Sequence, residues 1–133
     1  MIHVMDACAL IAFLRDEEGG DIVGALLANP EDDCIVHAIN LCEVYYDFLR
    51  VADKETASAA IADLLALGLL VCEEMDVAFW RTAGQLKATQ RLSLADCFAV
   101  ALVLRLDAIL VTSDHREFDE IASQGICSIH FFR

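Results

Sequence analysis

Four acidic residues attract attention because each adjoins the end of an apolar run or the start of a helical pattern. They are widely spaced, at Asp6, Glu43, Asp96 and Asp114. No cluster of His or Cys accompanies them, so a site built from them would offer carboxylate oxygens only. Mg²⁺ and Mn²⁺ are hard cations that prefer such oxygens and retain several waters. One or two of these ions can hold a phosphodiester, activate a water and stabilise the leaving oxygen.

Three polar residues lie close to two of these acids and are candidates for a supporting role. Thr112 and Ser113 precede Asp114, where their hydroxyls would bond a carboxylate or a metal-bound water. Asn40 lies three residues before Glu43, where it would contact a water or the substrate. An ordinary strand-end turn explains Thr112 and Ser113 equally well, and helix capping explains Asn40 slightly better.

Helix capping is also the competing explanation for the acids themselves. The spacings Asn40-x-x-Glu43 and Ser93-x-x-Asp96 match a polar N-cap followed three residues later by an acid. The other two acids precede predicted helices and would cap them directly. Capping does not explain why four acids would meet at one rim, since like charges held together raise each other's pKa and cost free energy. A divalent cation removes that cost.

Short apolar runs alternate with longer helical patterns along the chain. Strands are predicted at residues 2–5, 34–36, 69–72, 109–112 and 125–131. Helices are predicted at residues 7–15, 21–28, 40–51, 54–67, 76–90 and 93–106, with a short helical turn at 115–121. This order implies a three-layer α/β/α sandwich around a mostly parallel sheet of about five strands. Ligands of such sheets bind at the carboxyl ends of the strands, where the four acids are expected.

Composition excludes several classes of protein. The chain has 133 residues, 58% of them hydrophobic, and a net charge of −13. The length and the absence of a linker favour one domain over residues 1–133, and the apolar content excludes disorder. The negative charge argues against a broad basic surface that coats nucleic acid. No segment is long and apolar enough for a membrane span, and the first six residues lack the basic leader of a secretory signal. We therefore expect a cytoplasmic protein.

The cysteines and large aromatic residues are expected mainly in packing roles. The six cysteines form no C-x-x-C pair, which argues against a zinc site of that kind. Most lie among aliphatic residues, so we expect free, buried thiols. Tyr45, Tyr46 and Trp80 occur at helical spacing among apolar residues. Core or dimer packing is therefore the expectation for these three, rather than stacking on a base.

Few basic residues are available to hold phosphates. Arg81, Lys87 and Arg91 follow one predicted helix to its end, and the last two share a face. These three are candidates for holding phosphates that lead to the site, and a solvated helix face is the simpler explanation. Asp119 and Glu120 are candidates for an outer metal ligand, but we expect both to lie on a surface turn.

Four ordered segments resemble the motifs of PIN-domain ribonucleases, and especially of VapC-type toxins. They are MDACALIAFL at 5–14, INLCEV at 39–44, LSLADCFAVA at 92–101 and ILVTSDHREF at 109–118. The resemblance covers the whole chain in the family's order. It implies that the acids in these motifs, Asp6, Glu43, Asp96 and Asp114, are catalytic and bind the metal. It also implies RNA cleavage dependent on Mg²⁺ or Mn²⁺, a homodimer, and a cognate antitoxin that blocks the site. With RNA as the substrate, Arg81, Lys87 and Arg91 become candidates for contact with it.

Two other functions fit a small acidic α/β domain. One is a receiver-like phosphoacceptor module, which resembles this chain in binding Mg²⁺. Such modules carry a late lysine, whereas the lysines here are Lys54 and Lys87, and the first strand does not end in an acidic pair. The other is a non-catalytic, metal-free interaction protein of PIN-like fold, in which the acids serve only as helix caps.

Overall fold

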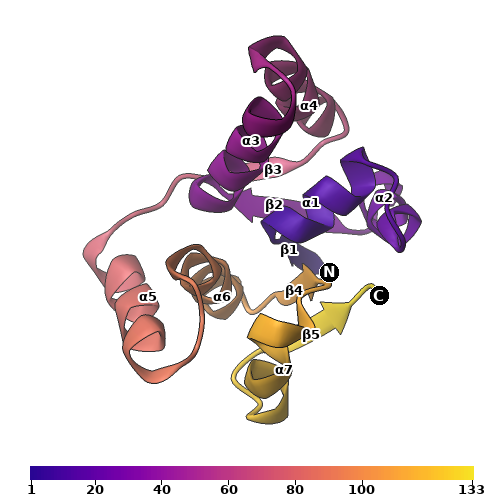
Figure 1. The fold of residues 1–133 in the computed structure, drawn as a ribbon. Coiled ribbons are helices and arrows are strands. Elements are labelled where there is room, and N and C mark those ends of the chain that lie inside the picture. The colour runs from indigo at the N-terminus through magenta and orange to yellow at the C-terminus, as the bar shows by residue number, and fades with distance from the viewer.

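A computed structural model describes all of residues 1–133, and its centre is a five-stranded sheet (Figure 1). The strands are β1 (Ile2–Met5), β2 (Asp33–His37), β3 (Leu70–Cys72), β4 (Ile109–Thr112) and β5 (Ser128–Phe131). They lie in the order β3-β2-β1-β4-β5, and every neighbouring pair is parallel. Short apolar strands of this kind are typical of a sheet that is covered on both faces.

Helices cover both faces of the sheet. The first layer contains α1 (Ala7–Leu14), α2 (Gly20–Ala28), α3 (Ala38–Val51) and α4 (Lys54–Ala66), and the second contains α5 (Val77–Thr89), α6 (Leu94–Leu106) and α7 (His115–Ser123). Val4 packs in the core beneath the second layer and Met5 in the core beneath the first, as alternation along a strand requires. The predicted three-layer α/β/α sandwich is confirmed. None of the helices has the length and apolar character needed to cross a membrane.

The strand order reverses between β1 and β4. The chain winds outwards from β1 to β2 and β3 on one side, and β4 and β5 lie on the other. Such a switch point opens a crevice at the carboxyl ends of the strands. Met5 pairs in register with Val111, so the residues that follow β1 and β4 emerge side by side. Asp6 and Asp114 are among those residues.

Most predicted boundaries lie within one residue of those in the structure, but the start of α3, the end of α7 and the start of β5 differ by two or three residues. α3 begins at Ala38 rather than at residue 40, because His37 caps it and its Nδ1 accepts the backbone N–H of Ile39 at 3.1 Å. Asn40 is therefore inside the helix and is not its cap. β5 begins at Ser128 rather than at residue 125, because Gly125 has a φ of 68° and forms part of the turn after α7.

The cysteines follow the expectation with one clear exception. All six are free, and Cys34, Cys72 and Cys97 are buried. Cys42 is exposed on α3. Asn40 and Val44 are the buried residues of this helix, and Cys42 lies two positions from each, so its side chain points away from the sheet.

Two of the aromatic residues are not core residues. Tyr46 is 48% exposed and Trp80 is 47% exposed, whereas Tyr45 is partly buried. Core packing is therefore wrong for Tyr46 and Trp80, and dimer packing stays a prediction for both. Each lies outside the narrow stripe of residues that its helix buries.

We predict that Phe118→Ala destabilises the protein by about 3–5 kcal/mol, because the truncation leaves a cavity beneath α7. Phe118 is fully buried and packs in the core that holds α7 against the sheet. The free energy of unfolding in urea measures the effect. Leu65→Ala, at a residue that is 46% exposed on α4, serves as the control and should change stability by about 0.5 kcal/mol or less. Equal losses for the two variants would contradict the assignment of Phe118 to the core.

Candidate metal centre

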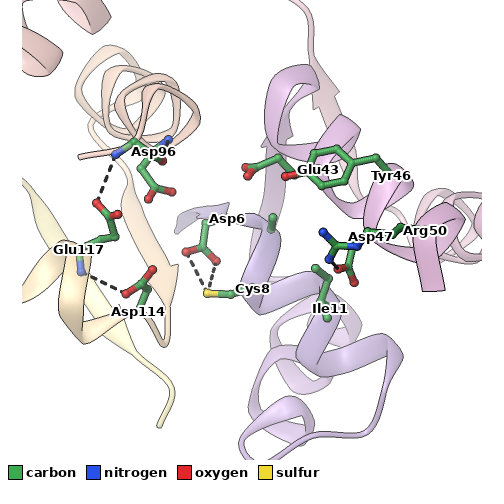
Figure 2. A pocket seen from close by; sticks show the side chains of 12 residues that line it. Asp6, Cys8, Ile11, Glu43, Tyr46, Asp47, Arg50, Asp96, Asp114 and Glu117 are labelled. Atoms are coloured by element: carbon green, nitrogen blue, oxygen red, sulfur yellow. Dashed lines mark hydrogen bonds and ion pairs between the residues drawn. The ribbon is translucent and has the colours of Figure 1, made fainter. Parts of the chain in front are cut away.

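The four predicted acids line one pocket at the switch point, with a volume of about 320 Å³ (Figure 2). Its walls come from the start of α1, one face of α3, and the starts of α6 and α7. The polar lining residues are Asp6, Cys8, Glu43, Tyr46, Asp47, Arg50, Ser93, Asp96, Asp114 and Glu117. Segments from both ends of the sequence therefore share one cavity.

Asp6 is the most buried of the four acids. It is 3% exposed, and it caps α1 by accepting the backbone N–H of Ala9 at 2.9 Å. The thiol of Cys8 donates to the same carboxylate, with Sγ 3.0 Å from Oδ1 and 3.1 Å from Oδ2. Burial raises the pKa of Asp6, and the charge of Asp114 acts in the same direction, whereas these hydrogen bonds oppose the rise. The hydrogen bonds therefore fix the carboxylate in place but do not fully offset the cost of burying its charge.

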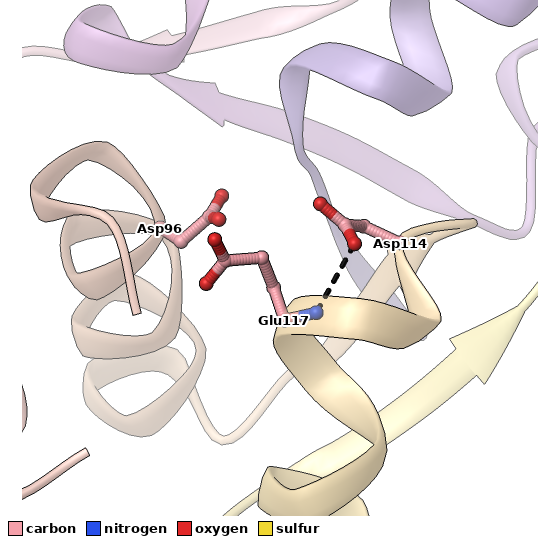
Figure 3. A group of neighbouring side chains, drawn as sticks. All are labelled: Asp96, Asp114 and Glu117. Atoms are coloured by element: carbon pink, nitrogen blue, oxygen red, sulfur yellow. Dashed lines mark hydrogen bonds between the residues drawn. The ribbon is translucent and has the colours of Figure 1, made fainter. Parts of the chain in front are cut away.

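Asp114 and Glu117 enter the pocket from the N-terminus of α7. Asp114 caps that helix by accepting the backbone N–H of Glu117 at 3.1 Å. Glu117 Oε2 in turn accepts the backbone N–H of Ser93 at 3.3 Å, which joins α7 to the start of α6. One oxygen each from Asp96, Asp114 and Glu117 lies within 4.8 Å of the other two (Figure 3). That spacing suits three ligands of a single cation.

Asp96 projects from the first turn of α6 towards this group. Ser93 caps α6, and its Oγ accepts the backbone N–H of Asp96 at 3.2 Å. Burial raises the pKa of Asp96 to about 7, and the charges of Asp6, Glu117 and Glu43 add to the shift. The carboxyl group is therefore poorly stabilised as an anion unless a cation accompanies it.

Glu43 faces the pocket from α3, on the opposite side from Asp114 (Figure 2). Because α3 begins at Ala38, Glu43 lies in the second turn of the helix and not in the first turn as predicted. Burial raises the pKa of Glu43, and the charge of Asp6 contributes. The side chain of Glu43 therefore projects into the pocket from one side of α3 and not from the N-terminus of that helix.

The predicted supporting residues are close to the acids, in different ways. Thr112 is fully buried, and its Oγ1 accepts the backbone N–H of Asp114 at 3.0 Å. Ser113 contacts Cys8, with both its backbone N and its Oγ 3.5 Å from Sγ. Cys8 therefore links the end of β4 to Asp6, a role that the sequence analysis did not assign to it.

Asn40 is buried one helical turn before Glu43. Its Nδ2 donates to the carbonyl of Ala95 on α6 at 3.4 Å, and its Oδ1 has no partner. Asn40 therefore ties α3 to the helix that carries Asp96.

The predicted basic residues lie outside the pocket. Arg81, Lys87 and Arg91 are exposed and do not line it. Lys87 Nζ donates to the carbonyl of Leu92 at 2.8 Å and so closes the α5–α6 connection. Asp119 and Glu120 are exposed on α7, as expected. Contact between the three basic residues and RNA stays a prediction.

Besides Cys8, sequence reasoning missed several polar residues that line the pocket. Glu117 was available from the spacing Asp114-x-x-Glu117, because residues three apart on a helix share a face. Tyr46, Asp47 and Arg50 follow Glu43 at helical spacing on α3, and the same rule would have found them. The sequence analysis assigned Tyr46 to packing and gave Asp47 and Arg50 no role.

The donor set fits a hard divalent cation. No Lys or Arg forms an ion pair with Asp6, Glu43, Asp96 or Asp114. No His lines the pocket, and Cys8 is its one sulfur residue, which does not suit zinc. Carboxylates in this number match the oxygen ligands of Mg²⁺ or Mn²⁺. Such an ion would also neutralise charges that otherwise repel each other.

Comparison with known proteins gives one family and one fold. The PIN domain family matches the chain over residues 4–124. VapBC-1 from nontypeable Haemophilus influenzae shares the fold, with 20% identity, a TM-score of 0.73, and coverage of 99% of this chain and 98% of that one. DNA-bound VapBC from Salmonella typhimurium is similar at 16% identity, with a TM-score of 0.75 and coverage of 100% and 99%. Mycobacterium tuberculosis VapC20, described as a sarcin–ricin loop cleaving toxin, is 17% identical, with a TM-score of 0.68 and coverage of 94% and 95%. No curated protein matches.

We predict that Asp96→Asn stabilises the metal-free protein at pH 8 and that this advantage fades as the pH falls towards about 4. The pKa of Asp96 is about 7 in the folded chain against the usual 3.8, so the folded state binds the proton more tightly than the unfolded state does. Protonation on acidification therefore favours folding, and the unfavourable ionised form is complete only above about pH 7. Thermal unfolding in EDTA at several pH values measures the difference. A variant less stable than wild type at pH 8 would contradict the argument.

Proposed function

The chain belongs to the PIN domain family, and we propose that it is a Mg²⁺- or Mn²⁺-dependent endoribonuclease, the toxin of a VapBC-type toxin–antitoxin pair. One observation carries the proposal: acids from four distant segments line a single pocket at the switch point of a parallel sheet. The reaction is hydrolysis of an RNA phosphodiester. The catalytic and metal-binding residues proposed are Asp6, Glu43, Asp96 and Asp114.

The residues of the chain would hold the ion and orient its ligands. Asp96 and Asp114 supply oxygens from the starts of α6 and α7, and Glu117 adds a third oxygen close to both. The bound ion would neutralise phosphate charge and activate a water for attack on phosphorus. Asp6 is kept in one orientation by Cys8 and by the first turn of α1, so it needs little rearrangement on binding. Thr112 holds the backbone of Asp114 in the same way.

A partner protein and a second copy of the chain belong to the same proposal. Several proteins of this fold were solved as VapBC complexes, some of them with DNA. We propose that a cognate antitoxin covers the acidic rim of the pocket and contributes a cation to it. We further propose that the protein is a homodimer and acts in the cytoplasm.

We predict that the purified protein cleaves RNA with Mg²⁺ or Mn²⁺ and not with EDTA. Asp6→Asn and Asp96→Asn should each lower the rate by at least about 100-fold, since each removes a ligand charge from the site. Cleavage is followed on total RNA by gel electrophoresis. Asp63→Asn, on the exposed side of α4, is the matched control and should retain full activity. Undiminished cleavage by both site variants would remove the proposed centre.

We also predict that millimolar Mn²⁺ raises the melting temperature of the wild-type protein. Binding to the folded state alone at 100 times the dissociation constant stabilises by about 2.7 kcal/mol. Asp114→Asn should lose most of this shift, whereas Asp63→Asn should keep it. If Mn²⁺ does not change the melting temperature of the wild type, the alternative function, a metal-free interaction protein, is favoured.

A further inference from the structure

One face of α3 extends the acidic pocket towards solvent. Glu43, Tyr46, Asp47 and Arg50 all line the pocket, and their spacing of three and four residues places them on one side of the helix (Figure 2). Glu43 is at the acidic end and Arg50 at the outer end. The two are separated by about 10 Å along the helix axis. We call these four residues the α3 strip.

Arg50 is the one basic residue among those that line the pocket. Its Nη2 donates to Asp47 Oδ1 at 2.9 Å, and Arg15 Nη2 lies 2.8 Å from Asp47 Oδ2. Two guanidinium groups therefore share one carboxylate, which leaves one net positive charge. The side chain of Arg50 is 70% exposed, whereas that of Asp47 is 16% exposed. Most N–H groups of Arg50 are thus free for an anion.

Arg15 is itself held by a contact with an aromatic ring. Its guanidinium carbon lies 4.6 Å from the centre of the Phe48 ring, and its side chain is 31% exposed. Arg15 can therefore hold Asp47 from the α1 side while Arg50 stays at the rim. The carboxylate of Asp47, fixed in this way, orients Arg50. Its single negative charge does not neutralise both guanidinium groups.

Tyr46 lies between the acidic end and Arg50 and is 48% exposed. Exposing an aromatic ring to water is not favourable for the stability of the fold, but the exposed ring offers a flat surface on which a base can stack. Proteins that bind single-stranded nucleic acid combine such rings with cations that track the backbone. The α3 strip has both parts in the order acid, ring, cation.

We propose that the α3 strip binds the nucleotide next to the scissile phosphate of a single-stranded RNA segment. Tyr46 stacks on the base and Arg50 binds the phosphate, while Asp47 and Arg15 position Arg50. The proposal rests on the proposed ribonuclease function and assigns part of its substrate site. It also gives a protein of net charge −13 a local contact for a polyanion where a broad basic surface is lacking.

Binding and cleavage of a fluorescein-labelled pool of random single-stranded RNA 20-mers test the proposal. Arg50→Ala should raise KM, and the Kd measured in an Asp96→Asn background, by at least about tenfold, with a smaller change in kcat. The slope of log K against log salt should fall by about 0.7, the value for one phosphate contact on a single strand. Tyr46→Leu should weaken binding at least about fivefold.

Conservative and remote variants separate binding from folding. Tyr46→Phe should retain affinity because the ring remains, and Arg50→Lys should retain the salt slope while losing part of the affinity. Lys54→Ala and Trp80→Ala remove an exposed cation and an exposed ring outside the pocket, and they should leave KM and Kd unchanged. Circular dichroism and melting temperatures confirm that each variant is folded.

The outcomes distinguish this proposal from the proposed function. If the wild type cleaves RNA and KM, Kd and the salt slope are unchanged in Arg50→Ala and Tyr46→Leu, the proposed role of the α3 strip is wrong. The proposed nuclease function would then still stand. If the wild type does not cleave RNA, the proposed nuclease function is wrong. The Kd values of the same variants would then still show whether the α3 strip binds RNA. Equal losses from Trp80→Ala and Tyr46→Leu would also overturn it, because binding would then lack a preference for the pocket.

Discussion

The rest of the structure depends on keeping Asp6 buried at the centre of a pocket that contains other acids. Burial and neighbouring charge both disfavour its ionised form. Besides Arg50 on α3, positive potential in the pocket comes from the N-termini of α1, α6 and α7, which all begin there. A parallel sheet with helical crossovers is the arrangement that points these termini at one edge. The fold therefore reduces the repulsion, and a bound cation would remove what is left.

Helix capping and metal binding turn out to be compatible explanations for the same residues. Asp6 caps α1 and Asp114 caps α7, yet both line the pocket. A carboxylate has several lone-pair sites, so one oxygen can accept a backbone N–H while another faces the cavity. The cap also fixes the side chain before a ligand arrives. A cap at the end of a central parallel strand is thus a good starting point for a site.

Hydrophobic periodicity was enough to predict the layers of the fold, because buried strands and amphipathic helices differ in their repeat. It placed β1 and β4 correctly, and with them the two acids of the switch point. It failed at the start of α3, where the cap is the ring nitrogen of His37, a residue that also belongs to β2. Histidine is not among the usual capping residues, so the sequence favoured Asn40. Local preference was overridden by a tertiary contact, since His37 Nε2 also bonds the carbonyl of Glu74 at 2.9 Å.

The basic residues were harder to predict because their roles depend on contacts between distant segments. Arg105 pairs with Glu74 and Asp76, and Arg133 pairs with Glu17, so neither is free to hold a substrate. Arg50 differs because its carboxylate partner is shared with Arg15, a residue 35 positions earlier in the sequence. A chain with nine basic residues and 22 acids has little attraction for RNA over most of its surface. Any affinity of the chain for a polyanion must therefore be local, and Arg50 is the basic residue that the structure places at the pocket.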